Sequence, residues 1–224
     1  MRVKGVLFDW GFTLAHPEPD GDVLYQQCAL KLGVAWPLKG LFRAIHEADN
    51  QVPEGAPPRY RREKDRTPFL KWWDVLLAHI GGDLPEDTKL KISGLASHMV
   101  RKVNWALYDD VIPFMKELKK RGLVLGLVSN VTMDRAGLEK YLDITVTAQD
   151  VGAGKPAPVI FLEALKRAGL KASEVLYVGD QYKIDIIGAN NVGIKAVLID
   201  RYGFGGPGKE CICIGGLSEL TDYL

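Results

Sequence analysis

Short apolar runs bounded by turn residues recur along the chain. Six of them are rich in Val, Ile and Leu, and they occupy residues 3–8, 123–128, 144–147, 175–178, 196–199 and 211–214. Runs this short and this uniformly apolar are typical of strands that are buried on both faces. Stretches of helical period separate most of them, as in residues 111–121 and 158–168. The alternation predicts an α/β fold with a parallel sheet and helices on both faces.

The alternation is interrupted between the first and second runs. Residues 16–104 contain no strand-like run of comparable strength, and helical periodicity appears instead in residues 23–32, 41–49, 68–80 and 86–103. This predicts an all-helical domain at residues 16–104, inserted into a core made of residues 1–15 and 105–224. Residues 51–66 are rich in proline and charge, which indicates a loop between two of the helices.

Composition excludes several classes of protein. The 224 residues include 29 Lys and Arg against 28 Asp and Glu, a net charge of +1, so no general attraction to nucleic acid or to an anionic membrane is expected. Three cysteines cannot form a disulfide framework, and the odd number fits a reducing compartment. The longest apolar stretches are too short for a secretory signal or a membrane span. We therefore expect a cytoplasmic protein with no nucleic-acid or membrane partner.

The residues directly after the apolar runs carry most of the candidate chemistry. These positions hold three carboxylates, a lysine, two hydroxyls and an amide, contributed by Asp9, Thr13, Ser129, Asn130, Lys155, Asp180 and Asp185. In open parallel sheets, ligand-binding side chains gather at the carboxyl ends of the strands. We therefore expect these seven side chains to form one site.

Carboxylates held close together are costly to keep ionised unless a cation lies among them. Oxygen ligands of this kind suit Mg²⁺, which leaves coordination positions open for a phosphoryl group. A lysine and hydroxyl or amide donors neutralise the remaining charge of that group, and one carboxylate can act as the nucleophile. The pattern favours a phosphoryl-transfer site.

Four segments also carry a resemblance to a known family. They read DWGFTL at residues 9–14, VSN at residues 128–130, GKPAP at residues 154–158, and VGD at residues 178–180 with Asp185 beyond it. Through this ordered set the chain resembles the haloacid dehalogenase-like hydrolase superfamily. The resemblance implies a Rossmann-like sheet, one Mg²⁺ ion among the four segments, and a helical cap inserted after the first segment. The insertion at residues 16–104 matches that type of cap.

The resemblance implies a role for each matched residue. The implied metal ligands are Asp9, the backbone carbonyl of Gly11, Asp180, and Asp185 either directly or through water. The implied catalytic residues are Asp9 as nucleophile, Thr13, Ser129, Asn130 and Lys155. Gly11, Ser129, Asn130 and Lys155 would contact the substrate, a small phosphorylated molecule.

Gly11 departs from the family pattern. Family phosphatases usually carry a second Asp two residues after the nucleophile, which protonates the leaving oxygen and then activates water. Glycine keeps the backbone carbonyl but supplies no proton, a loss worth roughly 10² to 10⁴ in rate when the leaving group is poor. The substrate would then carry a good leaving group, another group such as His16 or a cap residue would deliver the proton, or water would do so slowly.

The main hypothesis is an Mg²⁺-dependent phosphatase that acts through an aspartyl-phosphate. One alternative is a catalytically weak binding or regulatory member of the same fold. Others are a hydrolase of carbon–phosphorus (phosphonate) bonds or of carbon–halogen bonds. Asp180 and Asp185 argue against the last reaction, because the family's dehalogenases need no metal.

Two features of the insertion are candidates for a substrate role. One is a basic cluster made of Arg59, Arg61, Arg62, Lys64 and Arg66. This cluster either attracts an anionic substrate or forms a solvated loop. The other is the pair Trp72 and Trp73, which face different directions on a helix. We expect one of these indoles to pack between cap and core and the other to lie near the opening.

Overall fold

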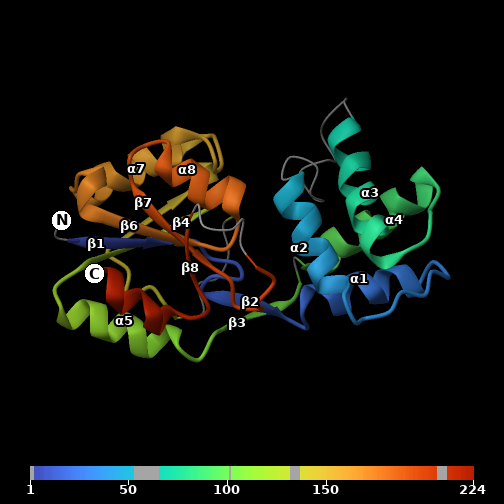
Figure 1. Cartoon of the computed structure of the whole chain (residues 1–224), viewed down its shortest axis with the longest axis horizontal. Coiled ribbons are helices and arrows are strands. Elements are labelled where there is room, and N and C mark those ends of the chain that lie inside the picture. Colours follow the sequence, from blue (N-terminus) through green and yellow to red (C-terminus); the bar gives the residue numbers. More distant parts are fainter. Residues whose placement is uncertain (1–2, 53–65, 101, 132–136, 206–210) are drawn as a thin grey trace. The chain divides into compact units, whose positions relative to one another are not determined.

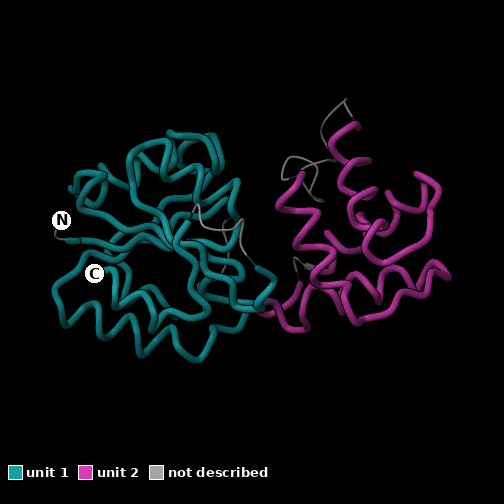
Figure 2. The backbone as a smooth tube through the Cα atoms, in the orientation of Figure 1, with its two compact units in different colours: residues 1–16, 105–224 teal, residues 17–104 magenta. Residues whose placement is uncertain are grey.

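The computed structural model describes residues 3–52, 66–100, 102–131, 137–205 and 211–224. It divides into two compact units, one made of residues 1–16 and 105–224 and the other of residues 17–104 (Figure 2). The first unit is α/β and the second is mostly helical. Each unit has a hydrophobic core of its own.

The α/β unit is built on one six-stranded sheet in which every neighbouring pair is parallel. Its strands are β1 (Gly5–Phe8), β4 (Val124–Ser129), β5 (Ile144–Thr147), β6 (Val175–Gly179), β7 (Lys195–Ile199) and β8 (Ile212–Ile214). Their order across the sheet is β5-β4-β1-β6-β7-β8. Each strand coincides with one of the six apolar runs, so the predicted parallel sheet is confirmed.

Helices cover both faces of this sheet. They are α5 (Val111–Lys120), α6 (Ala148–Val151), α7 (Pro158–Ala168), α8 (Ile187–Asn190), and the short helices η3 (Ala172–Glu174), η4 (Tyr182–Ile186) and η5 (Leu217–Tyr223). Figure 1 shows α5 on one side of the sheet, with α7 and α8 on the other. The Rossmann-like arrangement with helices on both faces is therefore confirmed.

The period-2 alternation of strand side chains explains the two layers. On β1, Val6 and Phe8 are buried in the cluster that contains the apolar residues of α5 and η5. Leu7, which lies between them, is buried with Tyr177 and Phe161 in the cluster of α7 and α8. A strand that is apolar at every position is thus needed to bury both faces at once.

The described residues of the second unit form four helices: α1 (Gly21–Leu30), α2 (Leu41–Gln51), α3 (Thr67–Ile80) and α4 (Glu86–Val100). Each corresponds to one predicted helical stretch. The proposed loop at residues 51–66 lies largely outside the described residues, and so do Arg59, Arg61, Arg62 and Lys64 of the basic cluster. Arg66 is described, and its guanidinium pairs with Glu86 at 2.6 Å.

The expected arrangement of the two adjacent tryptophans is wrong. Trp72 and Trp73 are both fully buried in the core of the helical unit. The indole N–H of Trp72 donates to Asp49 of α2 at 2.6 Å, and that of Trp73 donates to Ser93 of α4 at 3.2 Å. Helix α3 packs against a neighbouring helix on two sides, so adjacent residues that face different directions both find a core.

Two short strands were not predicted. Strand β2 (Ala15–Glu18) pairs with β3 (Asn104–Leu107) where the chain leaves and re-enters the α/β unit. Their sequences, AHPE and NWAL, lack the buried apolar pattern of the other strands, because Ala15, Trp105 and Leu107 contact the core while other residues of the two strands are exposed. Among its described residues, the insertion therefore consists of helices with a strand at each end.

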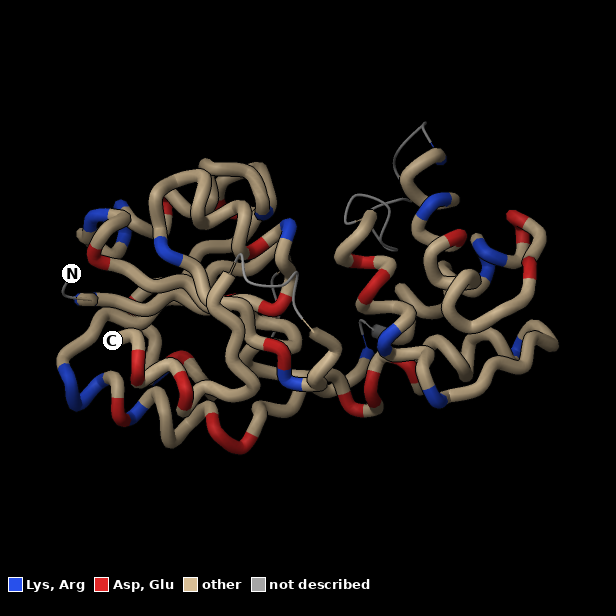
Figure 3. The backbone as a smooth tube through the Cα atoms, in the orientation of Figure 1, with Lys and Arg blue, Asp and Glu red and all other residues tan. Residues whose placement is uncertain are grey.

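The remaining composition-based expectations concern surface charge, cysteines and membranes. Acidic and basic residues are interspersed over the described parts of both units (Figure 3). Cys28 is buried, Cys211 is half-buried and Cys213 is exposed. Within the described ranges, no helix combines the length and the apolar character that crossing a bilayer requires.

Candidate active site

The order of the strands brings three of the expected side chains to one edge of the sheet. Asp9 directly follows β1, Ser129 ends β4, and Asp180 directly follows β6. These strands are neighbours, and the N–H of Asp9 donates to the carbonyl of Val178 on β6 at 2.9 Å. From β1 the chain continues to β4 and β5 on one side and then crosses to β6 on the other. The site thus lies where parallel sheets commonly bind ligands, at a topological switch point.

Asn130 holds the backbone of Lys155. Its side-chain oxygen accepts a hydrogen bond from the N–H of Lys155 at 2.5 Å, and its amide nitrogen donates to the carbonyl of Lys155 at 3.1 Å. Gly154 permits this approach, because a Cβ there would lie 2.6 Å from the Asn130 oxygen. The loop between α6 and α7 is therefore fixed against the end of β4, which positions the lysine.

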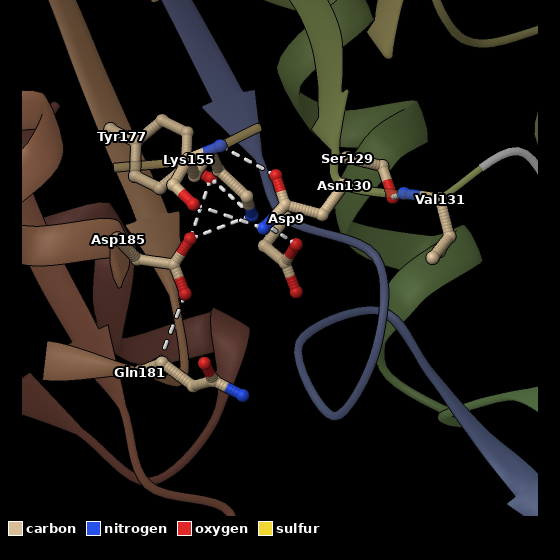
Figure 4. Close-up of polar contacts among 8 residues, drawn as sticks. All are labelled: Asp9, Ser129, Asn130, Val131, Lys155, Tyr177, Gln181 and Asp185. Carbon is tan, nitrogen blue, oxygen red and sulfur yellow. Dashed lines mark hydrogen bonds and ion pairs between the residues drawn. The ribbon is translucent and has the colours of Figure 1, made fainter. Parts of the chain in front are cut away.

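The ammonium of Lys155 is the centre of the site (Figure 4). It donates to Asp9, to Asp185 at 2.7 Å and to the hydroxyl of Tyr177 at 3.0 Å, so all three of its hydrogens are engaged. The hydroxyl of Tyr177 in turn donates to Asp185 at 2.9 Å. The other carboxylate oxygen of Asp185 accepts from the N–H of Gln181 at 3.0 Å.

Burial sets the charges of these groups. Desolvation raises the pKa of Asp9 to about 6, although the charge of Lys155 opposes the shift. Desolvation and the neighbouring charges of Asp9 and Asp185 raise the pKa of Asp180 well above its usual value. Burial disfavours the charged form of Lys155, but Asp185 and Asp9 outweigh that effect and raise its pKa. Near neutral pH, Asp9 is ionised beside a charged lysine.

The carboxylates form a group that suits a divalent cation. One oxygen from each of Asp9, Asp180 and Asp185 lies within 4.8 Å of the others, and all three side chains are largely buried. Lys155 supplies one positive charge against three negative charges, and buried charge without compensation is costly. Both oxygens of Asp185 already accept hydrogen bonds, whereas Asp180 takes part in no ion pair among the described residues. The donor set therefore fits Mg²⁺.

The two hydroxyl residues differ in their surroundings. Ser129 is 3% exposed, and its hydroxyl oxygen accepts from the N–H of Val131 at 3.2 Å. Thr13 is fully buried, and its hydroxyl has no hydrogen-bond partner in the described part of the chain. The carbonyl of Thr13 accepts from Arg201 at 2.8 Å. The structure thus joins neither hydroxyl to Lys155 directly, and a buried unpartnered hydroxyl is costly unless a ligand engages it.

Sequence reasoning missed two residues of this site. Tyr177 lies inside the apolar run of β6, where its ring packs in the core while its hydroxyl reaches Lys155 and Asp185. The available signal was a tyrosine three residues before Asp180 in an otherwise aliphatic strand, since buried tyrosines usually hydrogen-bond. Arg201 was missed because its guanidinium contacts the backbone of Thr13, the side chain of Asp110 and the ring of Tyr108, and none of these contacts is visible in the sequence.

Replacing Tyr177 with Phe tests the first of these residues. Lys155 would lose an acceptor and Asp185 a donor in a buried network, so we expect a loss of stability of about 1–2 kcal/mol. We also expect a fall in kcat/KM, because Lys155 would be positioned less firmly. Urea unfolding and steady-state kinetics measure both effects, with Tyr141→Phe as the control for removal of a hydroxyl outside the site. Unchanged stability and kinetics in Tyr177→Phe would contradict this role.

Comparison with known proteins identifies the class of protein. Residues 3–193 match the family model described as haloacid dehalogenase-like hydrolase. The chain belongs to this family, and it is a hydrolase. The resemblance based on the four sequence segments is thereby confirmed.

Curated relatives include two archaeal enzymes named glyceraldehyde 3-phosphate phosphatase. The chain is 35% identical to the one from Methanopyrus kandleri over 136 residues, a match that spans 58% of each chain. It is 28% identical to the one from Methanocaldococcus jannaschii over 205 residues, which cover 88% of this chain and 85% of the relative. The more similar relative is thus matched over little more than half of its length.

Solved structures of the family include both phosphatases and dehalogenases. A phosphatase from Thermococcus onnurineus is 27% identical, with a TM-score of 0.61 over 99% of this chain and 97% of its own. A 2-haloacid dehalogenase from Pseudomonas syringae is also 27% identical, with a TM-score of 0.59 over 98% of this chain and 97% of its own. Sequence identity and structural similarity therefore do not distinguish a phosphatase from a dehalogenase, and the distinction has to come from the chemistry of the site.

Proposed function

We propose that the chain is an Mg²⁺-dependent phosphatase of a small phosphorylated metabolite and acts through an aspartyl-phosphate on Asp9. The observation that carries the proposal is the environment of Asp9: a buried carboxylate at the end of β1 with a charged lysine on one side and two further carboxylates nearby. A carboxylate in such a setting is a suitable nucleophile. The names of the archaeal relatives support a small phosphorylated substrate.

The reaction has two steps at phosphorus. An oxygen of Asp9 forms a bond to phosphorus while the bond to the leaving oxygen breaks, and the leaving oxygen keeps the electron pair. Water then attacks the phosphorus of the aspartyl-phosphate, the Asp9 carboxylate departs, and the proton of the water passes to phosphate or solvent. Lys155 orients Asp9 and offers positive charge to the phosphoryl oxygens, while Ser129 and Thr13 would bind those oxygens and Asn130 keeps Lys155 in place.

The metal would be held by Asp9, Asp180 and the backbone carbonyl of Gly11, with Asp185 supporting the site through its hydrogen bonds. When bound, Mg²⁺ supplies positive charge that stabilises the phosphoryl group as it is transferred. A buried cluster of three carboxylates favours this chemistry over cleavage of a carbon–halogen bond, because an anionic phosphoryl group can bind beside those carboxylates only with a cation between them. The net charge of +1 and the odd number of cysteines support a cytoplasmic enzyme without a nucleic-acid partner.

The pKa values of the site predict how Mg²⁺ stabilises the protein. The pKa of Asp9, about 6, and the raised pKa of Asp180 exceed the unfolded carboxyl value of about 3.9. The metal-free folded protein therefore binds more protons than the unfolded chain, and its stability falls as the pH rises through this window. A bound Mg²⁺ ion replaces those protons, so we expect the gain in Tm from Mg²⁺ over EDTA to be larger at pH 7.5 than at pH 5.

Asp180→Asn is expected to abolish most of the increase in Tm that Mg²⁺ causes, and to make the remaining increase nearly the same at pH 5 and pH 7.5. Asp222→Asn, which removes an exposed carboxylate outside the site, is expected to change neither. Thermal unfolding followed by circular dichroism measures all three proteins. A gain that is the same at both pH values, or that persists in Asp180→Asn, would contradict the assigned metal site.

The proposed function itself is tested with the unaltered protein. Incubation with Mg²⁺ and either 4-nitrophenyl phosphate or acetyl phosphate is expected to release phosphate. EDTA is expected to stop the release, and excess Mg²⁺ to restore it. Release that continues at full rate in EDTA would overturn the metal dependence. No release from any phosphate ester or acyl phosphate would favour a binding or regulatory protein.

A further inference from the structure

The indole of Trp105 lies beside residue 11. A Cβ built on Gly11 would lie 3.4 Å from Cη2 and 3.5 Å from Cζ3 of Trp105, at the outer edge of its six-membered ring. The position two residues after Asp9 is therefore flanked by an aromatic ring. The Cβ of an acidic side chain introduced there would be in van der Waals contact with that ring.

Trp105 belongs to an aromatic cluster around the segment that follows Asp9. Its ring centroid is 6.2 Å from that of Trp10 and 6.3 Å from that of Phe12, which packs edge-on. Phe12 has a positive φ of 56°, a conformation that is unusual for a residue other than glycine. Pairing of β3 with β2 and the hydrogen bond from the N–H of Tyr108 to the carbonyl of Leu14, at 3.1 Å, hold Trp105 beside this segment. The cluster is thus a fixed apolar wall.

None of the described side chains joined to Asp9 is suited to give up a proton to a leaving group. All three hydrogens of Lys155 are engaged by Asp9, Asp185 and Tyr177. The hydroxyl hydrogen of Tyr177 is engaged by Asp185. The indole nitrogens of Trp10 and Trp105 are buried without a hydrogen-bond partner in the described part of the chain. An indole N–H donates a hydrogen bond but does not act as an acid near neutral pH.

We propose that this enzyme acts on phosphates whose leaving group departs without a proton, namely acyl and aryl phosphates, and that Trp105 and Gly11 determine this preference. The inference rests on the proposed phosphatase function. When Asp9 attacks phosphorus in such a substrate, the leaving oxygen takes the electron pair as a carboxylate or phenolate, both weak bases, so the balance of the step requires no acid. An alkyl phosphate would leave as an alkoxide and forgo the roughly 10² to 10⁴ that general acid catalysis contributes.

The preference is tested first with the unaltered protein and four probes: acetyl phosphate, 4-nitrophenyl phosphate, phenyl phosphate and glycerol 3-phosphate. We expect kcat/KM to fall as the basicity of the leaving oxygen rises, with glycerol 3-phosphate roughly 10² to 10⁴ below acetyl and 4-nitrophenyl phosphate. Comparable values for all four probes, with turnover that depends on Asp9, would overturn the inference and leave the phosphatase function standing. No Asp9-dependent turnover of any probe would overturn the function itself.

Double variants test whether Gly11 and Trp105 determine the preference for acyl and aryl phosphates. Gly11→Asp combined with Trp105→Val supplies an acid and the space for it, whereas Gly11→Asn with Trp105→Val supplies the same shape without the proton. We expect kcat/KM for glycerol 3-phosphate to be about tenfold or more higher in the double variant with Gly11→Asp than in the double variant with Gly11→Asn. On 4-nitrophenyl phosphate we expect little difference between the two double variants. His16→Gln, which removes another candidate acid, is expected to leave the ratio of kcat/KM between 4-nitrophenyl phosphate and glycerol 3-phosphate unchanged.

Equal rates for the two pairs of variants on glycerol 3-phosphate would overturn the assignment to Gly11 and Trp105. A fall in kcat/KM for glycerol 3-phosphate alone in His16→Gln would show that His16 delivers a proton to the leaving group and would overturn it as well. The comparison of the four probes needs no variant, so it decides the preference even where a double variant fails to fold.

Discussion

Replacement of Asp9 by Asn is expected to lower kcat/KM on acetyl phosphate by on the order of 10⁴ to 10⁶, the scale on which hydrolases lose activity with a catalytic nucleophile. Asn has nearly the same shape as Asp, and its side-chain oxygen still accepts a hydrogen bond from Lys155. Its amide cannot form the aspartyl-phosphate on which the proposed reaction depends. The loss is therefore expected in a protein that remains folded.

Steady-state kinetics measure this effect, and circular dichroism checks the fold. Asp222→Asn makes the same chemical change at an exposed position of the same unit and is expected to keep full activity. Asp9→Asn with more than about a tenth of the original activity would exclude covalent catalysis by Asp9.

Replacement of Lys155 by Met is expected to have the second large effect, on stability as well as activity. Lys155 is 4% exposed and pairs with both Asp9 and Asp185. Removal of one partner of a buried ion pair leaves uncompensated charge and typically costs 3–5 kcal/mol. We therefore expect a loss of about that size in the free energy of unfolding at pH 7.5 without Mg²⁺, together with loss of activity.

The loss of stability in Lys155→Met is expected to shrink as the pH falls. Without the ammonium, the pKa values of the buried carboxylates rise further above those of the unfolded chain, so the folded variant takes up protons as the solution is acidified. Because the folded state then binds more protons than the unfolded state, lower pH stabilises it. Urea unfolding at pH 5 and pH 7.5 measures the change.

Lys166→Met is the matched control. Lys166 is exposed and contacts only Glu163 on its own helix, so its removal is expected to cost less than about 0.5 kcal/mol at either pH. If Lys155→Met lowers the free energy of unfolding by the same amount at pH 5 and pH 7.5, Lys155 stabilises the protein through the packing of its side chain rather than through its charge beside Asp9 and Asp185.

Much of the α/β unit was predictable because its strands are buried on both faces. Such strands must be apolar at every position, which makes residues 5–8 or 175–179 conspicuous in the sequence. Parallel strands also bring their carboxyl ends to one edge, so the order of motifs along the chain predicted that Asp9 and Asp180 would meet. Neither inference needed knowledge of how individual side chains pack.

The parts that were missed depend on contacts between segments far apart in the sequence. Strands β2 and β3 pair with each other and are not buried along their whole length. Trp72 and Trp73 are both buried because α3 has a helix on each of two sides, which the periodicity of one helix does not reveal. Tyr177 joins the site through a single hydroxyl on a core strand. Trp105 is 94 residues from Gly11, and its place beside that glycine follows only from the fold.

Direct detection of the phosphorylated enzyme tests the central claim. The protein is incubated with Mg²⁺ and acetyl phosphate, quenched in acid during turnover, and digested for mass spectrometry. The account predicts one phosphoryl group on Asp9, labile to hydroxylamine as an acyl phosphate is, and absent from Asp9→Asn. A phosphoryl group on a different residue, or turnover with no phosphorylated enzyme in the unaltered protein, would contradict the account.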